Sequence, residues 1–207
     1  MTIIIIDYGA GNIANVMKAI ASTGLSAKLS HDSSEILAAD GVVLPGVGAY
    51  GAAMSALKER QLIGPLQAYA KSGKPLLGVC LGMQLLFERS TEFGETAGLG
   101  IIPGDIVTLP QQQGYKVPQM GWNQNQVRQL NPITSTLNDT YTYFVHSFYV
   151  QTAPKYIAAT VDYGQIEIPS VVVNDSGNVI GAQFHPEKSG KDGLLVWQSF
   201  KEMVDDK

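Results

Sequence analysis

Cysteine is nearly absent from this chain of 207 residues, which contains a single one, at position 80. One cysteine excludes an intramolecular disulfide and is typical of a reducing compartment, which we take to be the cytoplasm. Long apolar runs are also missing, because the longest, residues 75–87, is interrupted by glycine and glutamine and cannot span a bilayer. The apolar run at residues 3–6 lacks the length and the basic flank of a signal peptide. We therefore expect no membrane partner.

Basic charge is scarce as well, because 14 Lys and Arg stand against 18 Asp and Glu, for a formal net charge of −4. The absence of a Lys and Arg cluster argues against nucleic acid as the main partner. Apolar residues make up 45% of the chain and charged residues 15%, which is typical of a globular protein. We expect one domain spanning residues 1–207, with no metal site and no cofactor.

Strand and helix patterns alternate in the first half of the chain, whereas the second half is mainly β. Short apolar segments predict buried strands at residues 3–7, 42–44, 76–80 and 179–184. Helical spacing of apolar residues occurs at residues 13–20, 53–58, 62–71, 83–89 and 192–203. The pattern predicts a three-layer α/β fold, flavodoxin-like, with a central mostly parallel sheet flanked by helices and a β-rich second half. Functional residues then belong at the carboxyl ends of the strands.

The lone cysteine lies at such a strand end, in the run Gly78-Val79-Cys80-Leu81-Gly82. A strand, a sharp turn and a helix form the elbow that exposes a nucleophile above a sheet. Glycines two positions to either side permit the turn, because a Cβ there would collide with the neighbouring strand or helix. Free N–H groups at the start of the helix favour a negatively charged sulfur. The alternative is a small, buried, unreactive side chain.

An imidazole and a carboxylate follow far along the chain, in the turn Phe184-His185-Pro186-Glu187-Lys188. This turn ends a predicted buried strand, and Pro186 stops that strand. Cys80, His185 and Glu187 are suited to be the nucleophile, the base and the acid that orients the base. A His-x-Glu pair can also be ordinary surface chemistry, but its combination with the elbow favours catalysis.

Two glycine-rich turns remain open to more than one interpretation. Residues 9–14 match the dinucleotide pattern G-x-G-x-x-A, and Asp32 lies about twenty residues further on. The alternatives are an interface or a plain turn in which Asn12 is the N-cap of the following helix. The loop Pro45-Gly46-Val47-Gly48 can supply N–H groups to an anion or to an oxyanion beside Cys80, or it can be a simple turn.

Taken together, several runs in the same order resemble the class I glutamine amidotransferases, the triad glutaminases, from residue 7 to the end of the chain. They are Asp7-Tyr8-Gly9 with Gly11-Asn12, Pro45-Gly46-Val47-Gly48, Gly78-Val79-Cys80-Leu81-Gly82-Met83-Gln84, Met120-Gly121-Trp122-Asn123, Phe144-Val145-His146-Ser147 and His185-Pro186-Glu187-Lys188-Ser189. The first and fourth runs are similar to the branch that serves histidine biosynthesis, and they differ from glutaminases for anthranilate, GMP or carbamoyl phosphate. Gln119 departs from this pattern, since relatives often carry His there.

The resemblance implies a role for each matching residue. Cys80 attacks the side-chain amide of L-glutamine, His185 protonates the departing ammonia, and Glu187 holds the imidazole. An oxyanion is stabilised by the N–H of Leu81 and by one from Val47 or Gly48. The amino-acid end of glutamine is bound by Gln84, Glu92, Ser147 and Phe148. For Glu92 the alternative is a solvated charge at a helix end. His31 is expected at the surface and His146 as a packing residue at a strand end.

The resemblance also implies a protein partner, because ammonia is mostly protonated at neutral pH and must reach a second active site under shelter. That partner is a separate (β/α)8 cyclase in a 1:1 heterodimer, which makes imidazole glycerol phosphate and the aminoimidazole carboxamide ribotide. We expect docking residues at Asn12, Asn15, Trp122 and Lys188. For Trp122 burial in the core is the alternative. The peptide between Gly46 and Gly48 can rotate, and the resemblance supports activation through this loop when the cyclase docks.

Three hypotheses therefore stay open. The first is a glutaminase subunit that supplies ammonia, and the second is another triad glutaminase or thiol hydrolase of related fold. The third is a binding module in which the turn at residues 9–14 holds a nucleotide and Cys80 is inert. Release of ammonia from glutamine, with and without a cyclase, distinguishes the three.

Overall fold

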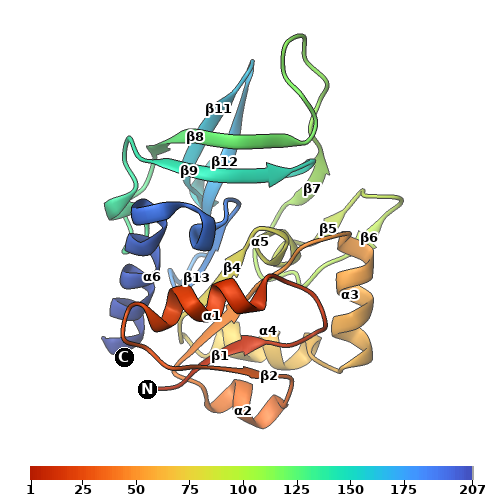
Figure 1. The fold of residues 1–207 in the computed structure, drawn as a ribbon. Coiled ribbons are helices and arrows are strands. Elements are labelled where there is room, and N and C mark those ends of the chain that lie inside the picture. Colours follow the sequence, from red (N-terminus) through yellow and green to blue (C-terminus); the bar gives the residue numbers. More distant parts are fainter. Residues whose placement is uncertain (207) are drawn as a thin grey trace.

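The centre of the protein is a twisted nine-stranded sheet, seen in a computed structural model that describes residues 1–206. Its strand order is β2-β1-β3-β4-β13-β12-β11-β8-β9 (Figure 1). The parallel part comprises β2 (Ala27–Ser30), β1 (Ile3–Ile6), β3 (Gly41–Leu44), β4 (Leu76–Val79) and β13 (Val179–Ala182). An antiparallel extension follows with β12 (Ile166–Val173), β11 (Ile157–Tyr163), β8 (Gln119–Val127) and β9 (Tyr141–His146). The predicted fold class is confirmed, and each predicted strand is present, with ends that differ from the expected ones by at most two residues.

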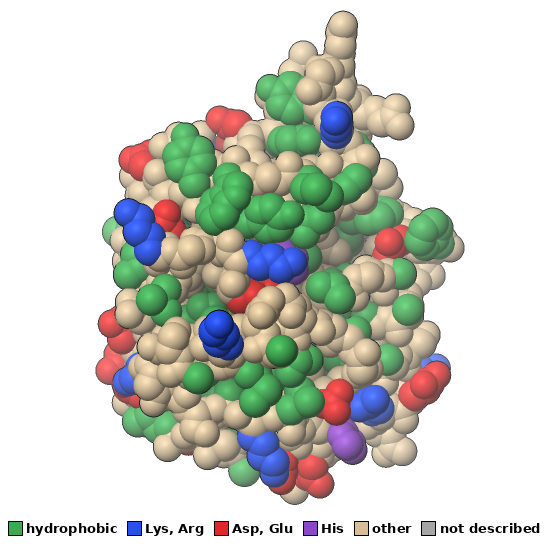
Figure 2. All heavy atoms as spheres, in the orientation of Figure 1, with side chains coloured by type: hydrophobic (Ala, Val, Ile, Leu, Met, Phe, Trp, Pro, Cys, Tyr) green, Lys and Arg blue, Asp and Glu red, His purple; other side chains and the backbone are tan. Residues whose placement is uncertain are grey.

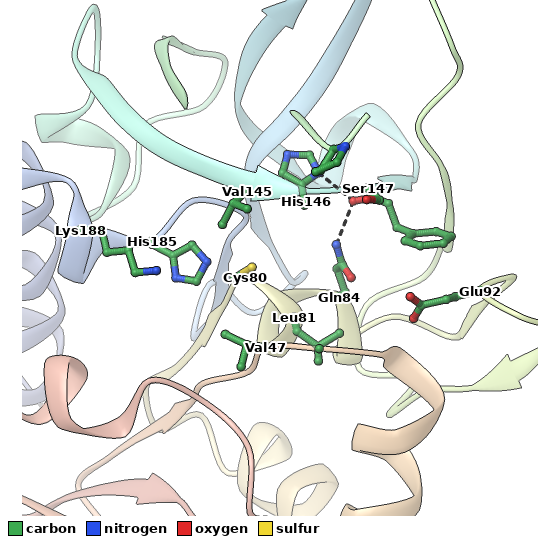
Figure 3. Close-up of a pocket in the computed structure, with 13 residues that line it drawn as sticks. Val47, Cys80, Leu81, Gln84, Glu92, Val145, His146, Ser147, His185 and Lys188 are labelled. Atoms are coloured by element: carbon green, nitrogen blue, oxygen red, sulfur yellow. Dashed lines mark hydrogen bonds between the residues drawn. The ribbon is translucent and has the colours of Figure 1, made fainter. Parts of the chain in front are cut away.

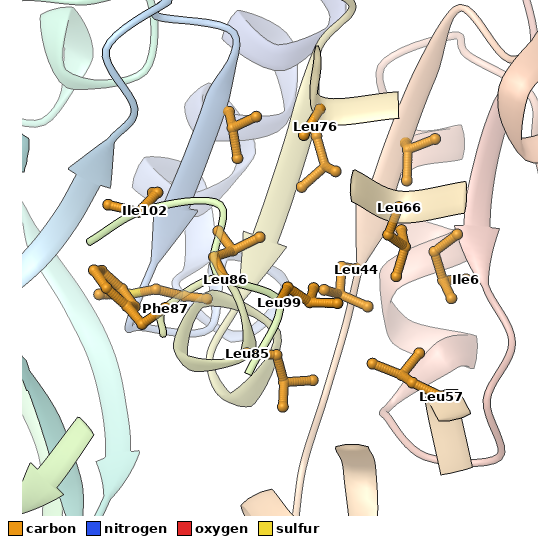
Figure 4. Packing of buried hydrophobic residues seen from close by; sticks show 14 of the residues in the cluster. Ile6, Leu44, Leu57, Leu66, Leu76, Leu85, Leu86, Phe87, Leu99 and Ile102 are labelled. Carbon is orange, nitrogen blue, oxygen red and sulfur yellow. The ribbon is translucent and has the colours of Figure 1, made fainter. Parts of the chain in front are cut away.

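Helices cover both faces of the parallel part, which explains the unbroken apolar strands. Ile4 and Ile6 pack on one face with α2 (Ser33–Ala38), α3 (Tyr50–Glu59), α4 (Ile63–Lys71) and α5 (Leu81–Leu85), as Figure 4 shows in part. Ile3 and Ile5 point to the other face, where α1 (Ile13–Ala21) and α6 (Gly190–Asp205) lie. Because successive strand residues face opposite sides, a strand buried between two helical layers must be apolar throughout.

A smaller sheet packs beside α5 and forms part of the wall of the site described below. It has the order β10-β7-β5-β6, with β10 (Phe148–Gln151), β7 (Asp105–Thr108), β5 (Arg89–Ser90) and β6 (Thr96–Ala97). Short 3-10 turns lie at Thr134–Thr136, Pro154–Tyr156 and Pro186–Lys188. Among residues 1–206 the structure has no helix with the length and apolar character needed to cross a membrane. One domain over residues 1–207 stays a prediction.

The predicted helix at residues 83–89 was wrong in its second half. Helix α5 ends at Leu85, and Arg89 already belongs to a strand. The carbonyl of Leu85 accepts a hydrogen bond from the N–H of Leu99, and the carbonyl of Leu86 accepts from Ile101 and Ile102. This returning segment takes the carbonyls that a longer helix would use, so tertiary pairing overrides the local helical spacing.

We predict that Gly82→Ala lowers the free energy of unfolding, because helix α5 approaches β3 too closely for a side chain at this position. A Cβ on Gly82 would lie 1.8 Å from the carbonyl oxygen of Leu44. Overpacking of this kind costs about 1–3 kcal/mol or more. Urea unfolding of both proteins measures the change.

Gly64→Ala is the matched control, because a Cβ there meets no atom within 4 Å in the part of the chain that the structure describes. Gly64 lies in α4, so alanine should leave stability unchanged or raise it slightly. Equal stability of the two variants would contradict a close contact at Gly82.

Candidate active site

Cys80 occupies a strained elbow between β4 and α5, as the sequence predicts. Its backbone has φ 54° and ψ −112°, a conformation that residues with a side chain rarely adopt. The N–H of Cys80 donates to the carbonyl of Ala182 at 2.8 Å, which anchors the elbow to β13. A Cβ on Gly78 would lie 2.8 Å from the carbonyl oxygen of Gly82. The flanking glycines are therefore required by the close packing of α5 on β4.

Parallel pairing of β4 with β13 brings His185 to the same end of the sheet as Cys80. Ala182 is the register partner of Val79; Cys80 follows Val79 directly, and His185 comes three residues after Ala182. The N–H of His185 donates to the carbonyl of Tyr143, and its own carbonyl accepts from the hydroxyl of Ser189. The backbone of His185 is thus held on two sides, independently of the contacts that its ring makes.

The imidazole of His185 is paired with the carboxylate of Glu187 inside the protein. Nδ1 of His185 lies 2.8 Å from Oε1 of Glu187, and the two side chains are 3% and 1% exposed. Burial by itself lowers the pKa of His185, but interactions with Cys80 and Glu187 outweigh burial and raise it to about 9. With Nδ1 bound to the carboxylate, Nε2 is the ring nitrogen left for chemistry at the thiol.

A cavity of about 340 Å³ opens over Cys80 and His185 (Figure 3). Ten residues singled out in the sequence line it, namely Val47, Gly48, Cys80, Leu81, Gln84, Glu92, Ser147, Phe148, His185 and Lys188. Glu187 contacts Nδ1 of His185 but is not among the lining residues. The other three predicted residues, Asn12, Asn15 and Trp122, are not among them either. The thiol of Cys80, the imidazole of His185 and several polar side chains therefore share one cavity.

The glycine-rich loop after β3 is fixed at its start and open at its end. The hydroxyl of Tyr8 donates to the carbonyl of Pro45 at 2.7 Å, and a Cβ on Gly46 would lie 2.5 Å from that hydroxyl. Burial, with a smaller effect from Cys80, raises the pKa of Tyr8 above its usual range, so this phenol stays a neutral donor. Gly48 has φ 97°, and a Cβ there meets no described atom within 4 Å. The end of the loop is therefore less closely packed than its start.

Two polar side chains lie on the side of the cavity away from His185 (Figure 3). The amide nitrogen of Gln84 donates to the carbonyl of Phe148 at 2.9 Å and to Oε1 of Gln183 at 3.0 Å. Oε2 of Glu92 accepts from the N–H of Tyr50, the first residue of α3. Glu92 is half-buried and caps a helix, so it is not a freely solvated charge at a helix end.

The sequence analysis did not place three of the lining residues, Pro118, Val145 and His146, in the site. His146 is buried at the end of β9, which confirms its prediction as a packing residue, but its ring also lines the cavity. Its place in the matching run, next to Ser147, was the sequence signal for this. Tyr8, which holds the loop at Pro45, carried no signal beyond its place in a matching run.

Outside the cavity, Asp32, the acidic residue of the dinucleotide pattern, caps a helix instead. Asp32 is the N-cap of α2, and its carboxylate accepts from the N–H groups of Ser34 and Glu35. Asn12 is the N-cap of α1, although its side chain makes no capping hydrogen bond. His31 lies at the surface, as expected, with its side chain 65% exposed.

The four predicted docking residues lie near one face of the molecule. Trp122 is 51% exposed on β8, and its ring meets the ring of Tyr143 edge to face. Nζ of Lys188 lies 5.9 Å from the centre of the Tyr143 ring. Asn15 is exposed on α1 and Asn12 is half-buried. Figures 1 and 2 show α1, β8 and β9 turned toward the same side, with apolar side chains gathered over β8 and β9.

Comparisons with known proteins agree with this geometry. A family model described as "Glutamine amidotransferase class-I" matches residues 4–197. The "Imidazole glycerol phosphate synthase subunit HisH" of Lacticaseibacillus casei is 53% identical over 204 residues, covering 99% of this chain and 97% of the relative. The protein of the same name from Lactiplantibacillus plantarum is 54% identical over 200 residues, covering 97% and 95%.

Solved structures show the same fold at low identity. "Structure of PurLQS from Thermotoga maritima" matches with a TM-score of 0.76 at 20% identity, covering 97% of each chain. "Crystal structure of glutamine amidotransferase" matches with a TM-score of 0.75 at 16% identity, covering 98% of each. The resemblance read from the motifs is confirmed. The chain belongs to the class I glutamine amidotransferase family and, within it, to the group of the HisH subunits.

Proposed function

We propose that this protein is the glutaminase subunit of an imidazole glycerol phosphate synthase. It hydrolyses L-glutamine to glutamate and ammonia and passes the ammonia to a cyclase subunit in histidine biosynthesis. The observation that carries the proposal is the strained thiol of Cys80 beside the buried His185–Glu187 pair, in a cavity that also holds Gln84 and Glu92. Such a site needs neither a metal nor a cofactor for amide hydrolysis, because the nucleophile and the proton carrier are side chains.

In the proposed reaction, Cys80 transfers its proton to His185 and its sulfur attacks the side-chain carbonyl carbon of glutamine. The C–N bond then breaks, and Nε2 of His185 gives its proton to the leaving nitrogen, which departs as ammonia. Water activated by His185 hydrolyses the γ-glutamyl thioester to glutamate. Glu187 does not itself transfer a proton, but it holds the ring and stabilises the imidazolium.

The oxyanion formed in both steps needs donors close to Cys80. We assign this role to the N–H of Leu81, the first residue of α5, and to an N–H of Val47 or Gly48. Anchoring at Pro45 and open space at Gly48 allow this last peptide to turn either its N–H or its C=O toward the sulfur. We propose that the docked cyclase favours the N–H orientation and so activates the enzyme.

The partner belongs to the proposal because ammonia released into water at neutral pH becomes ammonium and loses its nucleophilicity. Relatives at 53% identity are named as subunits of imidazole glycerol phosphate synthase. We propose a 1:1 pair with a (β/α)8 cyclase that uses the ammonia to make imidazole glycerol phosphate and the aminoimidazole carboxamide ribotide. Asn12, Asn15, Trp122 and Lys188 form the proposed docking face. The cytoplasm remains the proposed compartment, because the thiol must stay reduced to act.

Cys80→Ser should abolish glutamine hydrolysis, because a hydroxyl in the same place is a far weaker nucleophile than a thiolate. The variant should keep its fold and its binding to the cyclase, since the two side chains are similar in size. In the reconstituted complex, synthesis from glutamine should stop, while synthesis from added ammonia should continue at the rate of the unaltered complex. Product formation from each nitrogen source measures both.

The unaltered protein, assayed alone and with the cyclase, is the reference for this experiment. Hydrolysis of glutamine by Cys80→Ser at a near-normal rate would assign Cys80 a structural role and overturn the mechanism. Loss of the ammonia-dependent reaction as well would show that the variant no longer supports the cyclase.

Glu187→Gln should lower turnover and move its alkaline limit to lower pH. The raised pKa of His185, about 9, keeps the imidazolium available up to that pH, and the proton is lost as pH rises through it. A neutral amide at position 187 removes a charge that raises this pKa, so the limit should move toward the ordinary value for histidine. Turnover should fall less than the about 10²–10⁴-fold expected for loss of His185 itself.

The pH profile of turnover in the complex measures this effect. Glu95→Gln is the control, because that carboxylate is 69% exposed and lies outside the cavity lining. A defect in the Michaelis constant alone, with an unchanged pH profile, would remove Glu187 from the triad.

A further inference from the structure

The side-chain amide of Gln84 is held in one orientation by acceptors on two other elements. Both hydrogens of its Nε2 are directed to oxygens, one on the backbone of Phe148 in β10 and one on the side chain of Gln183 after β13. A backbone carbonyl can only accept, so the nitrogen of the amide must face it. The nitrogen donates to the carbonyl of Phe148, and Figure 3 shows the amide oxygen of Gln84 on the other side, with Glu92 beyond it.

His146 supports the same carbonyl from the other side. Its Nδ1 lies 2.9 Å from the carbonyl oxygen of Phe148, which therefore accepts from His146 and from Gln84 together. Burial is the main reason why the pKa of His146 falls to about 4, and the neighbouring His185 lowers it further. The ring is therefore neutral at physiological pH, with its single proton on Nδ1. A neutral ring with this tautomer is a fixed donor and not a second base.

Gln183 is the second acceptor for the amide nitrogen of Gln84, and it lies in the core. Its side chain is fully buried, and its backbone N–H donates to Ser170 in β12 at 2.9 Å. Among residues 1–206, Nε2 of Gln183 and Nε2 of His146 are buried without a hydrogen-bond partner. Burying polar atoms in this way costs stability. The proposed reaction steps use neither residue, so the proposed mechanism alone does not account for this cost.

We propose that His146 and Gln183 are positioning residues that set the selectivity of the site for the α-ammonium group of its substrate. They act through Gln84, whose Oε1 they leave facing the cavity as an acceptor for that group. This inference rests on the proposed glutaminase function and adds two residues to it.

Gln84 needs neighbours to fix its orientation because a carboxamide is nearly symmetric. Its NH2 and oxygen have almost the same size, so an unrestrained Gln84 could rotate by half a turn at little steric cost. The rotated amide would present two N–H donors to a cationic group and repel it. Two acceptors on the nitrogen side, one of them fixed by His146, make that rotation unfavourable because a buried amide oxygen would face other oxygens. The network thus discriminates by presenting an acceptor and excluding a donor.

His146→Leu tests the donor, and His146→Asn is its matched partner, because Nδ2 of asparagine lies close to where Nδ1 of histidine lies. Each variant is assayed in complex with the cyclase, using L-glutamine and glutaramate, which has the same carboxamide but no ammonium. For His146→Leu we expect kcat/KM for glutamine to fall about 10- to 100-fold, mostly through KM, as loss of a hydrogen bond to a charged group implies. The kcat/KM for glutaramate should be unchanged, and His146→Asn should recover most of the loss.

Gln183→Met is the second variant, since it removes the acceptor and keeps the length of the side chain. It should reduce the preference for glutamine over glutaramate in the same way. The rate at which iodoacetamide alkylates Cys80 should stay that of the unaltered protein in every variant, which checks that the elbow is intact.

Equal losses of kcat/KM for glutamine and for glutaramate would overturn the inference. So would a kcat/KM for glutamine in His146→Asn no higher than that in His146→Leu. So would an unchanged KM for glutamine in both His146→Leu and Gln183→Met. Failure of the proposed function is a separate result, because the unaltered complex would then release no ammonia from glutamine at all.

Discussion

The contact between the start of α5 and the end of β3 is the constraint on which the site depends. Only glycine at position 82 allows the helix backbone to approach the Leu44 carbonyl, because a Cβ there would lie 1.8 Å from it. That approach forces the chain through the strained conformation at Cys80 and lifts the thiol above the sheet. It also brings the loop that begins at Pro45 next to the elbow. The candidate nucleophile and the candidate oxyanion donors are therefore positioned by the same contact.

Two histidines in one cavity have pKa values shifted in opposite directions because their partners differ. His185 faces a carboxylate and a thiol, which raise its pKa to about 9 despite burial. His146 faces a backbone carbonyl, which cannot carry a full charge, so burial dominates and its pKa falls to about 4. The first is suited to carry a proton in the reaction. The second, whose ring is neutral well above pH 4, is suited to hold a fixed hydrogen bond.

The features that local chemistry determines could be predicted from the sequence. Apolar strands, the elbow glycines around Cys80 and the turn at His185 each follow from a few neighbouring residues, and parallel strand order then brings the two ends together. Features that depend on distant pairing could not be predicted in this way. The helix after Cys80 ends early because residues 99–102 take its carbonyls, and nothing in residues 83–89 shows this. In the same way, the contacts of Gln84 with Phe148 and Gln183 join residues from three separate parts of the chain.

The central claim is that Cys80 attacks the side-chain carbonyl of glutamine bound in this cavity. The most direct measurement is covalent labelling of the complex by a glutamine analogue with an electrophilic side chain, followed by mass spectrometry of the peptides. The account predicts one adduct per chain, on Cys80, which forms more slowly when L-glutamine is present in excess. An adduct at another residue, or labelling of Cys80 that excess glutamine does not slow, would contradict the account.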